Sequence, residues 1–464
     1  MLVIISDIHL TDGSSGEVIS DSAFRLFRNR ISDMAYDASW RCDENNQEYY
    51  KPVEQMDIIL LGDILDMIRS EQWNEALDTL MPWTKERQDD FFENIEKIAS
   101  GILDFNASSF SILKGIAEGD LLIPKEMRRA NEEEKATRKI KYKASEEKVS
   151  IKVNIYYMIG NHDWFFYIKD KRINKIRNRV IDELGLANEK DQPFPYAYND
   201  SKVIQEIQEA HKVFAEHGDR FDKTNYQTPH RDASSVGDVV VIKMLNEIPK
   251  KIEECIRRSP KSAGTEEEIK TFIKQIREID NLRPYSLAPA WITQVLKETK
   301  LDSEVVNKAI SDALELVIEG FRHNEIISEN HWLSFKMKLA EIVADIFSIE
   351  TLGNVISHLG FNKDQFESYK QYAIDISKDE EKDFFVMGHT HYAEVVPMNS
   401  YIDSSKEKRS KIYLNTGTWR SVHFQGHADK NSFISYKTMS IAGFFLPDER
   451  KGRSFEFWTG YLAL

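Results

Sequence analysis

Five short fragments of this 464-residue chain concentrate aspartate, histidine and asparagine. The last of them places two histidines one residue apart, and the four others each combine an aspartate with a histidine, an asparagine or a second aspartate. In chain order they are Ser6-Asp7-Ile8-His9, Gly62-Asp63-Ile64-Leu65-Asp66, Gly160-Asn161-His162-Asp163, His217-Gly218-Asp219 and Gly388-His389-Thr390-His391. Carboxylates, imidazoles and amide oxygens are ligands for divalent metals, so the fragments predict a metal site.

A hydrolytic site with two metal ions needs such donors and one group that bridges ions about 3.5–4 Å apart. Seven residues supply this set: Asp7, His9, Asp63, Asn161, His217, His389 and His391. The spacing of two residues in the first and last fragments predicts that both side chains of each pair lie on one side of an extended backbone. No cysteine belongs to the set, which argues against a structural zinc site.

Each fragment follows an apolar run with the composition of a buried strand. These runs span residues 2–6, 57–61, 153–159, 212–216 and 384–387. Between the first two, apolar residues recur at helical spacing over residues 21–35, with Asp21 as the expected N-cap. Strand, helix and strand in this order predict a βαβ unit whose ligands lie at the carboxyl ends of the strands.

The rest of the chain alternates between strand and helix patterns. This predicts an α/β core in three parts, residues 1–65, 151–231 and 381–464, interrupted by helical insertions at 66–150 and 232–380. The second insertion is expected to form a cap, with helices that include 302–320 and 331–350. Residues 125–148 hold nine Lys or Arg against six Glu, a net charge of +3. We interpret them as a solvated helix or a flexible connection rather than a phosphate-binding arm.

The composition predicts a soluble protein of a reducing, cytoplasmic compartment. Only Cys42 and Cys255 are present, far apart in sequence, so no disulfide framework is expected. The apolar start is too short for a signal peptide, and no stretch approaches the roughly 20 apolar residues of a membrane span. The formal charge of -15 disfavours general nucleic-acid binding, although a local basic groove stays open.

The ordered series Asp-x-His, Gly-Asp-x-x-Asp, Gly-Asn-His-Asp, His-Gly and Gly-His-x-His resembles the calcineurin-like metallophosphoesterase superfamily. The resemblance covers about half of the chain and leaves both insertions outside it. It implies a four-layer α/β sandwich of two mixed sheets flanked by helices. It also implies two divalent ions as cofactors, with manganese favoured over iron, zinc, magnesium or nickel.

The resemblance further implies a role for each fragment. Asp7, His9 and His391 would bind one ion, Asn161, His217 and His389 the other, and Asp63 would bridge them. A bridging hydroxide would attack phosphorus in line. His162 would protonate the leaving oxygen or contact the phosphate, and Asp66 would orient His162.

The fragment around His217 departs from the His-Gly-His form of some family members. Its His-Gly-Asp form resembles the branch that contains the lipid A precursor pyrophosphohydrolases, which have arginine at the position of His162. His211 competes with His217 for the ligand role, although the residues before it have a helical pattern.

The segment from Tyr413 to Trp419 also resembles a family block, and we expect it to hold the metal-bearing loops from below. Arg420 and His423 follow it and are candidate contacts for a substrate phosphate, with a solvated or ion-paired arginine as the alternative. Residues 164–166, Trp-Phe-Phe, either line the substrate mouth or pack against an insertion.

The favoured function is a phosphodiesterase or pyrophosphatase that acts on a nucleotide or another small phosphoester. A DNA or RNA nuclease is the first alternative and would need a basic channel near the metals. A phosphoprotein phosphatase comes next, and a non-catalytic scaffold with the same fold is least favoured because every expected ligand is present.

Overall fold

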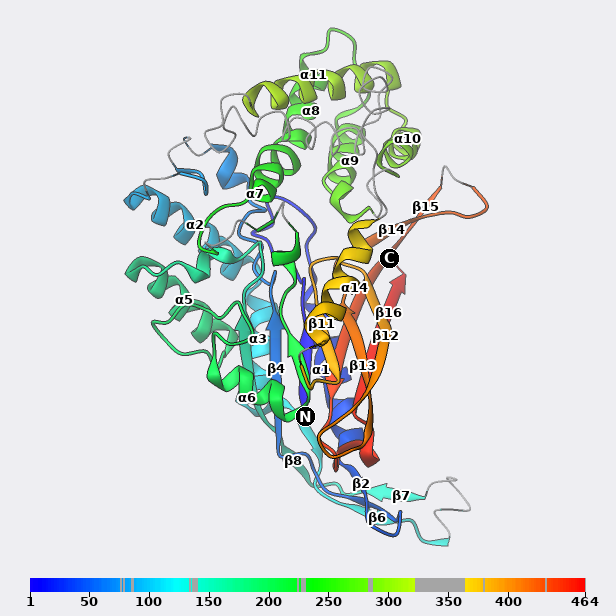
Figure 1. Cartoon of the computed structure of the whole chain (residues 1–464). Coiled ribbons are helices and arrows are strands. Elements are labelled where there is room, and N and C mark those ends of the chain that lie inside the picture. Colours follow the sequence, from blue (N-terminus) through cyan, green and yellow to red (C-terminus); the bar gives the residue numbers. More distant parts are fainter. Residues whose placement is uncertain are drawn as a thin grey trace.

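The structure is a computed structural model. It describes residues 1–463 except 76, 78–79, 85–86, 133–134, 136–140, 223–224, 227–230, 283–286, 322–363, 379 and 430–431. The fold is mixed α/β, as the alternation of patterns predicts (Figure 1). The helix predicted at 331–350 lies outside the described residues.

The larger sheet has six strands. Its central strands β1, β4 and β9 are parallel, whereas β15 runs antiparallel to β1 and pairs with β14 and β16. The bounds are β1 (Leu2–Ile5), β4 (Gln55–Leu61), β9 (Lys152–Met158), β14 (Ser421–Gln425), β15 (Phe433–Phe444) and β16 (Phe455–Ala463). The three parallel strands are the predicted runs at 2–6, 57–61 and 153–159, which confirms them within one or two residues.

The smaller sheet has four strands in the order β10-β11-β13-β12. The first three are parallel and β12 is antiparallel, so this sheet is also mixed. Its strands are β10 (Val213–Ala215), β11 (Phe384–Met387), β12 (Ala393–Ile402) and β13 (Lys408–Thr416). A crossover that contains the whole cap separates β10 from β11, although the two strands are neighbours.

Alternation of side chains along the strands builds two cores on the larger sheet. Ile58 and Leu60 point into the main core, whereas Ile59 and Leu61 point into a second cluster that the smaller sheet shares through Phe384. The two sheets therefore face each other across this second cluster.

Helices cover the outer faces of both sheets. The main core of the larger sheet lies under α1 (Asp21–Ala38), α2 (Asp89–Phe105), α3 (Ala107–Gly115) and α5 (Lys171–Leu184). On the smaller sheet, Phe385 and Tyr413 pack with Ala373 of α14 (Asp364–Ser377). A further helix, α6 (Lys202–Ala210), precedes β10.

Helix α1 begins one residue earlier than the predicted capping implies. Ser20 is the N-cap, and its hydroxyl accepts from the backbone N–H of Ser22 at 3.3 Å. The prediction of Asp21 as N-cap was wrong. Asp21 is the first helical residue, where its charge favours the positive end of the helix dipole.

The first insertion is only partly helical. Its helices α2 and α3 belong to the main core, but the charge-rich stretch forms an antiparallel ribbon in its described part, with β5 paired to β8 and β6 to β7. The bounds are β5 (Leu122–Pro124), β6 (Met127–Arg129), β7 (Tyr142–Ala144) and β8 (Lys148–Ser150). The prediction of a solvated helix or a flexible connection was therefore wrong for the residues that form these strands.

The ribbon packs at its base on a short hairpin of β2 (Trp40–Cys42) and β3 (Glu48–Tyr50). The rings of Trp40 and Tyr142 lie 4.8 Å apart, and the hydroxyl of Tyr50 donates to Pro124 O at 2.9 Å. Composition alone does not reveal this partner, because the hairpin lies about 90 residues away in sequence.

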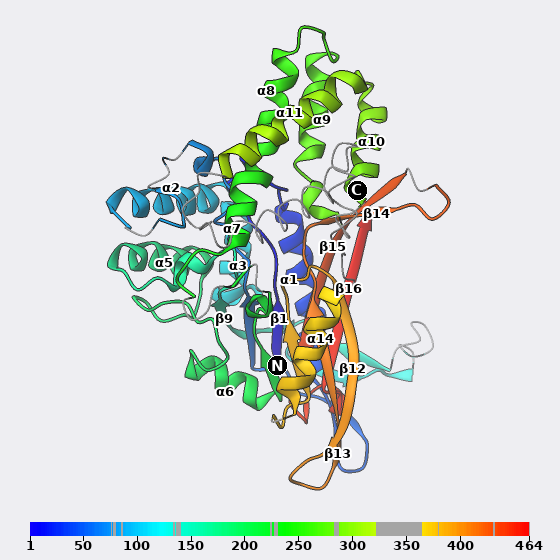
Figure 2. The same cartoon turned by 45° about the horizontal axis from the view of Figure 1, so that its top comes forward.

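The cap has a hydrophobic core of its own. Its described helices are α7 (Val236–Val240), α8 (Glu247–Arg258), α9 (Glu266–Ile276), α10 (Ala288–Thr299) and α11 (Ser303–Phe321). A π-helical segment, Val241–Asn246, joins α7 to α8. Both views place these helices at one end of the sheets (Figure 1, Figure 2). The predicted part boundaries, from 1–65 through 381–464, stay predictions.

None of the helices in the described part of the chain is both long and apolar enough to cross a membrane.

The shared cluster between the sheets predicts a stability effect. Ile59→Ala should lower the free energy of unfolding by about 2–5 kcal/mol, because Ile59 is fully buried between the sheets and its truncation leaves a cavity. Val203→Ala on α6 is the control, since Val203 is 51% exposed and should change stability by less than about 0.5 kcal/mol. Urea denaturation measures both, and equal values would contradict the assigned core.

Candidate metal centre

The predicted ligands lie at the carboxyl ends of five strands. Asp7, Asp63 and His217 each lie two residues beyond the end of β1, β4 and β10. His9 lies in the same loop as Asp7, Asn161 follows β9, and both His389 and His391 follow β11. Backbone hydrogen bonds hold these loops together, from Asp7 N to Gly62 O at 3.1 Å and from Gly388 N to His217 O at 2.9 Å. The edge of both sheets is therefore the place where the ligands meet, as the strand pattern predicts.

The first donor group consists of Asp7, His9 and His391, whose ligand atoms lie within 4.8 Å of one another. The Nε2 atoms of His9 and His391 are 2.9 Å apart, and His391 Nε2 lies 3.5 Å from Asp7 Oδ1. The chain brings together the N-terminal strand and a segment more than 380 residues away.

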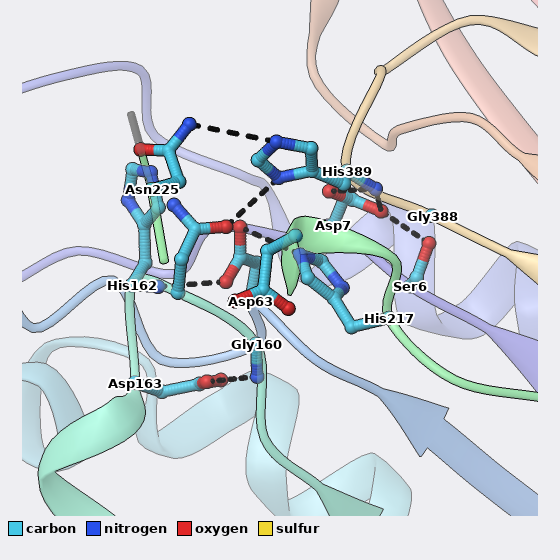
Figure 3. Close-up of polar contacts among 12 residues, drawn as sticks. Ser6, Asp7, Asp63, Gly160, His162, Asp163, His217, Asn225, Gly388 and His389 are labelled. Carbon is cyan, nitrogen blue, oxygen red and sulfur yellow. Dashed lines mark hydrogen bonds and ion pairs between the residues drawn. The ribbon is translucent and has the colours of Figure 1, made fainter. Parts of the chain in front are cut away.

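The second donor group consists of Asp63, His217 and His389, also within 4.8 Å (Figure 3). His217 Nε2 lies 3.2 Å from Asp63 Oδ2, and Asn161 Oδ1 lies 2.9 Å from His389 Nδ1. The amide oxygen therefore joins this group through the ring of His389.

Asp63 lies between the two groups. Its Oδ2 is 3.2 Å from His217 Nε2 and 3.8 Å from His9 Nε2, while its Oδ1 accepts from the backbone N–H of His162 at 2.8 Å. One carboxylate thus reaches a nitrogen of each group.

Outer hydrogen bonds set the tautomers of two ligand histidines. His9 Nδ1 lies 2.8 Å from Asp66 Oδ2, and His217 Nδ1 lies 2.8 Å from the carbonyl of Leu61. Both oxygens only accept, so each Nδ1 carries a proton and donates it. In the neutral rings each Nε2 therefore presents a lone pair to the cluster, the arrangement of metal-binding histidines.

The donors fit a cation. His217 Nε2 is buried and finds no hydrogen-bond donor among the described residues, yet it faces the carboxylate oxygen of Asp63. Two electron-rich atoms at 3.2 Å repel each other unless positive charge lies between them. Oxygen and imidazole nitrogen donors without sulfur suit Mn²⁺, Fe and Zn²⁺.

The electrostatics of the cluster favour positive charge. Burial alone would lower the pKa of His9, but hydrogen bonds to Asp66 and Asp7 outweigh it and raise the pKa to about 9. The pKa of His217 is also raised well above its ordinary value, since the Asp63 charge outweighs burial. Conversely, burial would raise the pKa of Asp63, and the charges of His217, His162 and His9 hold it well below its usual range.

Five of the ligands have a left-handed backbone, with φ between 51° and 67°: Asp7, His9, Asp63, His389 and His391. The predicted extended backbone around Asp7 and His391 was wrong. The side chains of Asp7 and His9 still converge, with His9 Nε2 3.8 Å from Asp7 Oδ1, whereas His389 and His391 belong to different donor groups. Aspartate and histidine tolerate this region better than most residues, but each costs about 1–3 kcal/mol that surrounding contacts must offset.

Asp66 holds two histidines at once. Its Oδ1 lies 2.6 Å from His162 Nδ1, and its Oδ2 lies 2.8 Å from His9 Nδ1. The charge and hydrogen bond of His162 lower the pKa of Asp66 although burial would raise it. The sequence predicts only the contact with His162. His162 itself is partly exposed, whereas His9 and Asp66 are buried.

The segment from Tyr413 to Trp419 lies beneath the ligand loops. Thr418 Oγ1 donates to Asp7 O at 2.7 Å, and Asn415 Nδ2 donates to Gly388 O at 2.7 Å. These contacts agree with the supporting role predicted for this segment.

Two residues that contact the ligand His389 were not predicted from the sequence. His389 Nε2 lies 3.5 Å from both Asp222 Oδ2 and Asn225 Nδ2. These residues follow η5 (Asp219–Phe221) and belong to no motif, so no sequence signal identifies them.

The aspartate of the His-Gly-Asp fragment has a structural partner. Asp219 lies 3.1 Å from Arg231 Nη2, which also donates to the carbonyl of Gly160. Arg231 is buried and thereby links the fragments that contain His217 and Asn161. In the sequence, the only feature that could have indicated this ion pair was the aspartate of the His-Gly-Asp fragment, Asp219.

Three other predicted residues lie outside the donor groups. Arg420 forms a bidentate pair with Asp280 of the cap, at 2.9 and 3.0 Å. His423 stacks on Trp291 with ring centroids 4.2 Å apart. His211, the competitor of His217, donates from Nδ1 to Ile207 O at 2.8 Å and belongs to no donor group of the described residues.

The aromatic residues after Asp163 pack inward. Trp164 and Phe165 are buried and stacked, and Trp164 Nε1 donates to Asp238 Oδ2 of α7 at 3.0 Å. Of the two predicted roles, packing against an insertion is the one observed.

In comparisons with known proteins, the chain matches no family model and no curated protein.

The close approach at Gly62 gives a sharp test of the cluster. A Cβ at this position would lie 2.5 Å from His217 Nδ1 and 2.7 Å from Gly160 N, so Gly62→Ala should displace His217 and lower the affinity for Mn²⁺ at least tenfold. Gly452→Ala is the matched control, because its φ of +78° resembles the +81° of Gly62 but its Cβ meets only one atom, at 3.9 Å. Isothermal titration of Mn²⁺ measures the difference, and equal affinities would refute the arrangement.

Metal binding should also stabilise the fold. Mn²⁺ at one hundred times its Kd is expected to add about 2.7 kcal/mol to the unfolding free energy, because the ion binds only the folded chain. Asp63→Asn should remove most of the resulting rise in Tm, since Asp63 contributes to both groups, whereas the exposed His427→Ala should retain it. Scanning fluorimetry with Mn²⁺ or EDTA measures the shift, and no rise in the unmodified chain would contradict a metal site.

Proposed function

We propose that this chain is a metal-dependent phosphoester hydrolase of the calcineurin-like metallophosphoesterase superfamily, built as a four-layer sandwich with two insertions. The observation that carries the proposal is that all seven predicted donors meet at one place. Six of them form two groups whose ligand atoms lie within 4.8 Å, Asn161 contacts His389, and Asp63 lies against a nitrogen of each group. Two mixed sheets that face each other, with helices outside both, support the sandwich.

The two donor groups would each hold one divalent ion. Asp7, His9 and His391 would hold the first ion and Asn161, His217 and His389 the second. Asp63, which lies against His9 of the first group and His217 of the second, would bridge the ions. The ions would polarise the phosphoryl oxygens and lower the pKa of a bound water molecule, and nitrogen and oxygen donors make manganese our first choice.

His162 is the proposed proton donor to the leaving oxygen. Asp66 holds its Nδ1 at 2.6 Å, so Nδ1–H is committed to the carboxylate and Nε2–H is the proton available for transfer. The ring centroid of His162 lies 4.6 Å from that of His9, while its side chain stays partly exposed. It therefore lies where a substrate can reach both the ligands and a proton.

Asp66 contacts both the proposed proton donor, His162, and the metal ligand His9. A single buried carboxylate orients the proton donor and a metal ligand, so a change in one hydrogen bond is transmitted to the other. This is why Asp66 belongs with the catalytic machinery even though it faces no open space.

A small phosphoester is favoured over a nucleic acid as the substrate. The basic ribbon leads into the amino end of β9 through Ile151, whose N–H donates to Leu121 O, whereas Asn161 follows the carboxyl end. Seven residues of strand separate these edges by roughly 23 Å. Figure 1 accordingly places β6 and β7 at the end opposite the cap. The described strands of the basic stretch 125–148, in which a basic channel would be sought, thus lie at the other edge of the sheet.

The activity is tested with bis(p-nitrophenyl) phosphate and Mn²⁺. The unmodified chain should release nitrophenolate, and His162→Ala should lower kcat by about 10²–10⁴-fold, the usual contribution of a positioned general acid. His427→Ala, a change at an exposed histidine, should leave kcat within twofold.

Parallel assays separate the alternatives. Cleavage of p-nitrophenyl phosphate in preference to the diester would favour a monoesterase, and degradation of DNA or RNA that His162→Ala abolishes would favour a nuclease. No hydrolysis of any phosphoester with Mn²⁺, Fe²⁺ or Zn²⁺ would refute the proposal.

A further inference from the structure

One carboxylate of the cap lies buried between two arginines of the core. Asp280, in the turn η7 (Ile279–Asn281), is 2.9 Å from Arg420 Nη1 and 3.5 Å from Arg69 Nη2. The three side chains are at most 8% exposed. The two arginines belong to different loops, so the cap joins two parts of the core at one point.

Arg69, the first of the two arginines, is connected to Asp66 by a backbone hydrogen bond. The N–H of Arg69 donates to Asp66 O at 3.2 Å and closes the turn that contains both residues. The N–H of Asp66 donates to Leu10 O at 2.8 Å. The position of Arg69 therefore helps to set the direction of the carboxylate that holds His9 and His162.

The Arg420 side leads to Asp7. The N–H of Arg420 donates to Thr418 Oγ1 at 3.2 Å, and that hydroxyl donates to Asp7 O at 2.7 Å. The N–H of Trp419 donates to the same carbonyl at 3.2 Å. Arg420 thus continues a short chain of hydrogen bonds that ends on the backbone of a ligand with a left-handed φ.

A second polar contact beside Asp280 ties the same loops. Asn281 Nδ2 donates to Glu17 Oε2 at 3.0 Å, and Glu17 accepts from both the N–H and the hydroxyl of Ser421 at 2.7 and 2.6 Å. The cap therefore contacts the loop after Asp7, the turn after Asp66 and the segment before β14.

We propose that Asp280 is a positioning residue, through which the docked cap fixes the turns that carry Asp7 and Asp66. Removing one member of a buried ionic group leaves the remaining charges without compensation, so the arginines must move or take up water when Asp280 loses its charge. The strained backbone of the ligands needs surrounding contacts to hold it, and this junction supplies them from outside the core. The same pairing keeps Arg420 with the cap rather than with a substrate.

Hydrogen–deuterium exchange on the full chain tests the positioning directly. Asp280→Asn should raise the exchange rate at least fivefold in peptides that cover residues 62–71 and 416–422, far from the changed residue in sequence. Asp302→Asn is the matched control, because Asp302 belongs to the same cap but pairs with the exposed Lys261 at 2.8 Å. Faster exchange confined to the cap helices, or equal effects of the two variants, would overturn the proposal.

A second readout rests on the proposed function. With bis(p-nitrophenyl) phosphate, kcat per folded molecule should fall at least tenfold in Asp280→Asn while KM changes less than threefold, and the affinity for Mn²⁺ should fall as well. Arg420→Lys, which keeps the charge but loses the bidentate pair, should give an intermediate kcat. An unchanged kcat and Mn²⁺ affinity in Asp280→Asn would overturn the positioning role.

Normalisation to the folded fraction, measured by circular dichroism, separates positioning from general instability. If the unmodified chain is inactive and binds no metal, the hydrolase proposal fails, yet the exchange experiment still decides whether Asp280 fixes the two turns.

Discussion

The buried carboxylate of Asp63 is the constraint around which the site is built. A charge in the interior is tolerated only with close compensation, and here imidazoles lie on two sides of it at 3.2 and 3.8 Å. Those imidazoles come from the ends of different strands. Holding His9 and His217 against one aspartate therefore requires the carboxyl-terminal ends of strands from both facing sheets to lie close together, and the apolar cluster shared by the sheets holds them there.

This arrangement has a conformational cost. Ligands at five positions adopt a left-handed backbone, and in their neutral forms two buried histidines present lone pairs toward carboxylates. Nearby polar residues compensate, through Asp66 on one side and the Thr418 segment on the other. A cluster of this kind attracts protons or metal ions, since both neutralise the same concentration of negative charge.

The cap also contributes contacts that hold the loops of the metal site in place. It has its own hydrophobic core, which includes Phe433 of β15, and it also meets the loops that carry the predicted ligands through buried charges. Such contacts contribute little net stability but penalise misplacement strongly, because each unpaired charge would remain buried. They are therefore suited to setting the position of the loops that carry ligands.

By itself the sequence determined the donor chemistry, its order along the chain and the strands that precede it. Those features are local: a strand alternates with period two, and aspartate or histidine keeps its ligand chemistry in any fold. The shared role of Asp66, the Asp219–Arg231 link and the pairing of Arg420 with Asp280 were decided only by the tertiary structure. Each depends on side chains that approach through space and are not neighbours in sequence. The ribbon formed by β5, β6, β7 and β8 also could not be predicted from sequence alone. Its many charges predict a solvated segment, but cross-strand hydrogen bonds and packing on Trp40 and Tyr50 stabilise strands there.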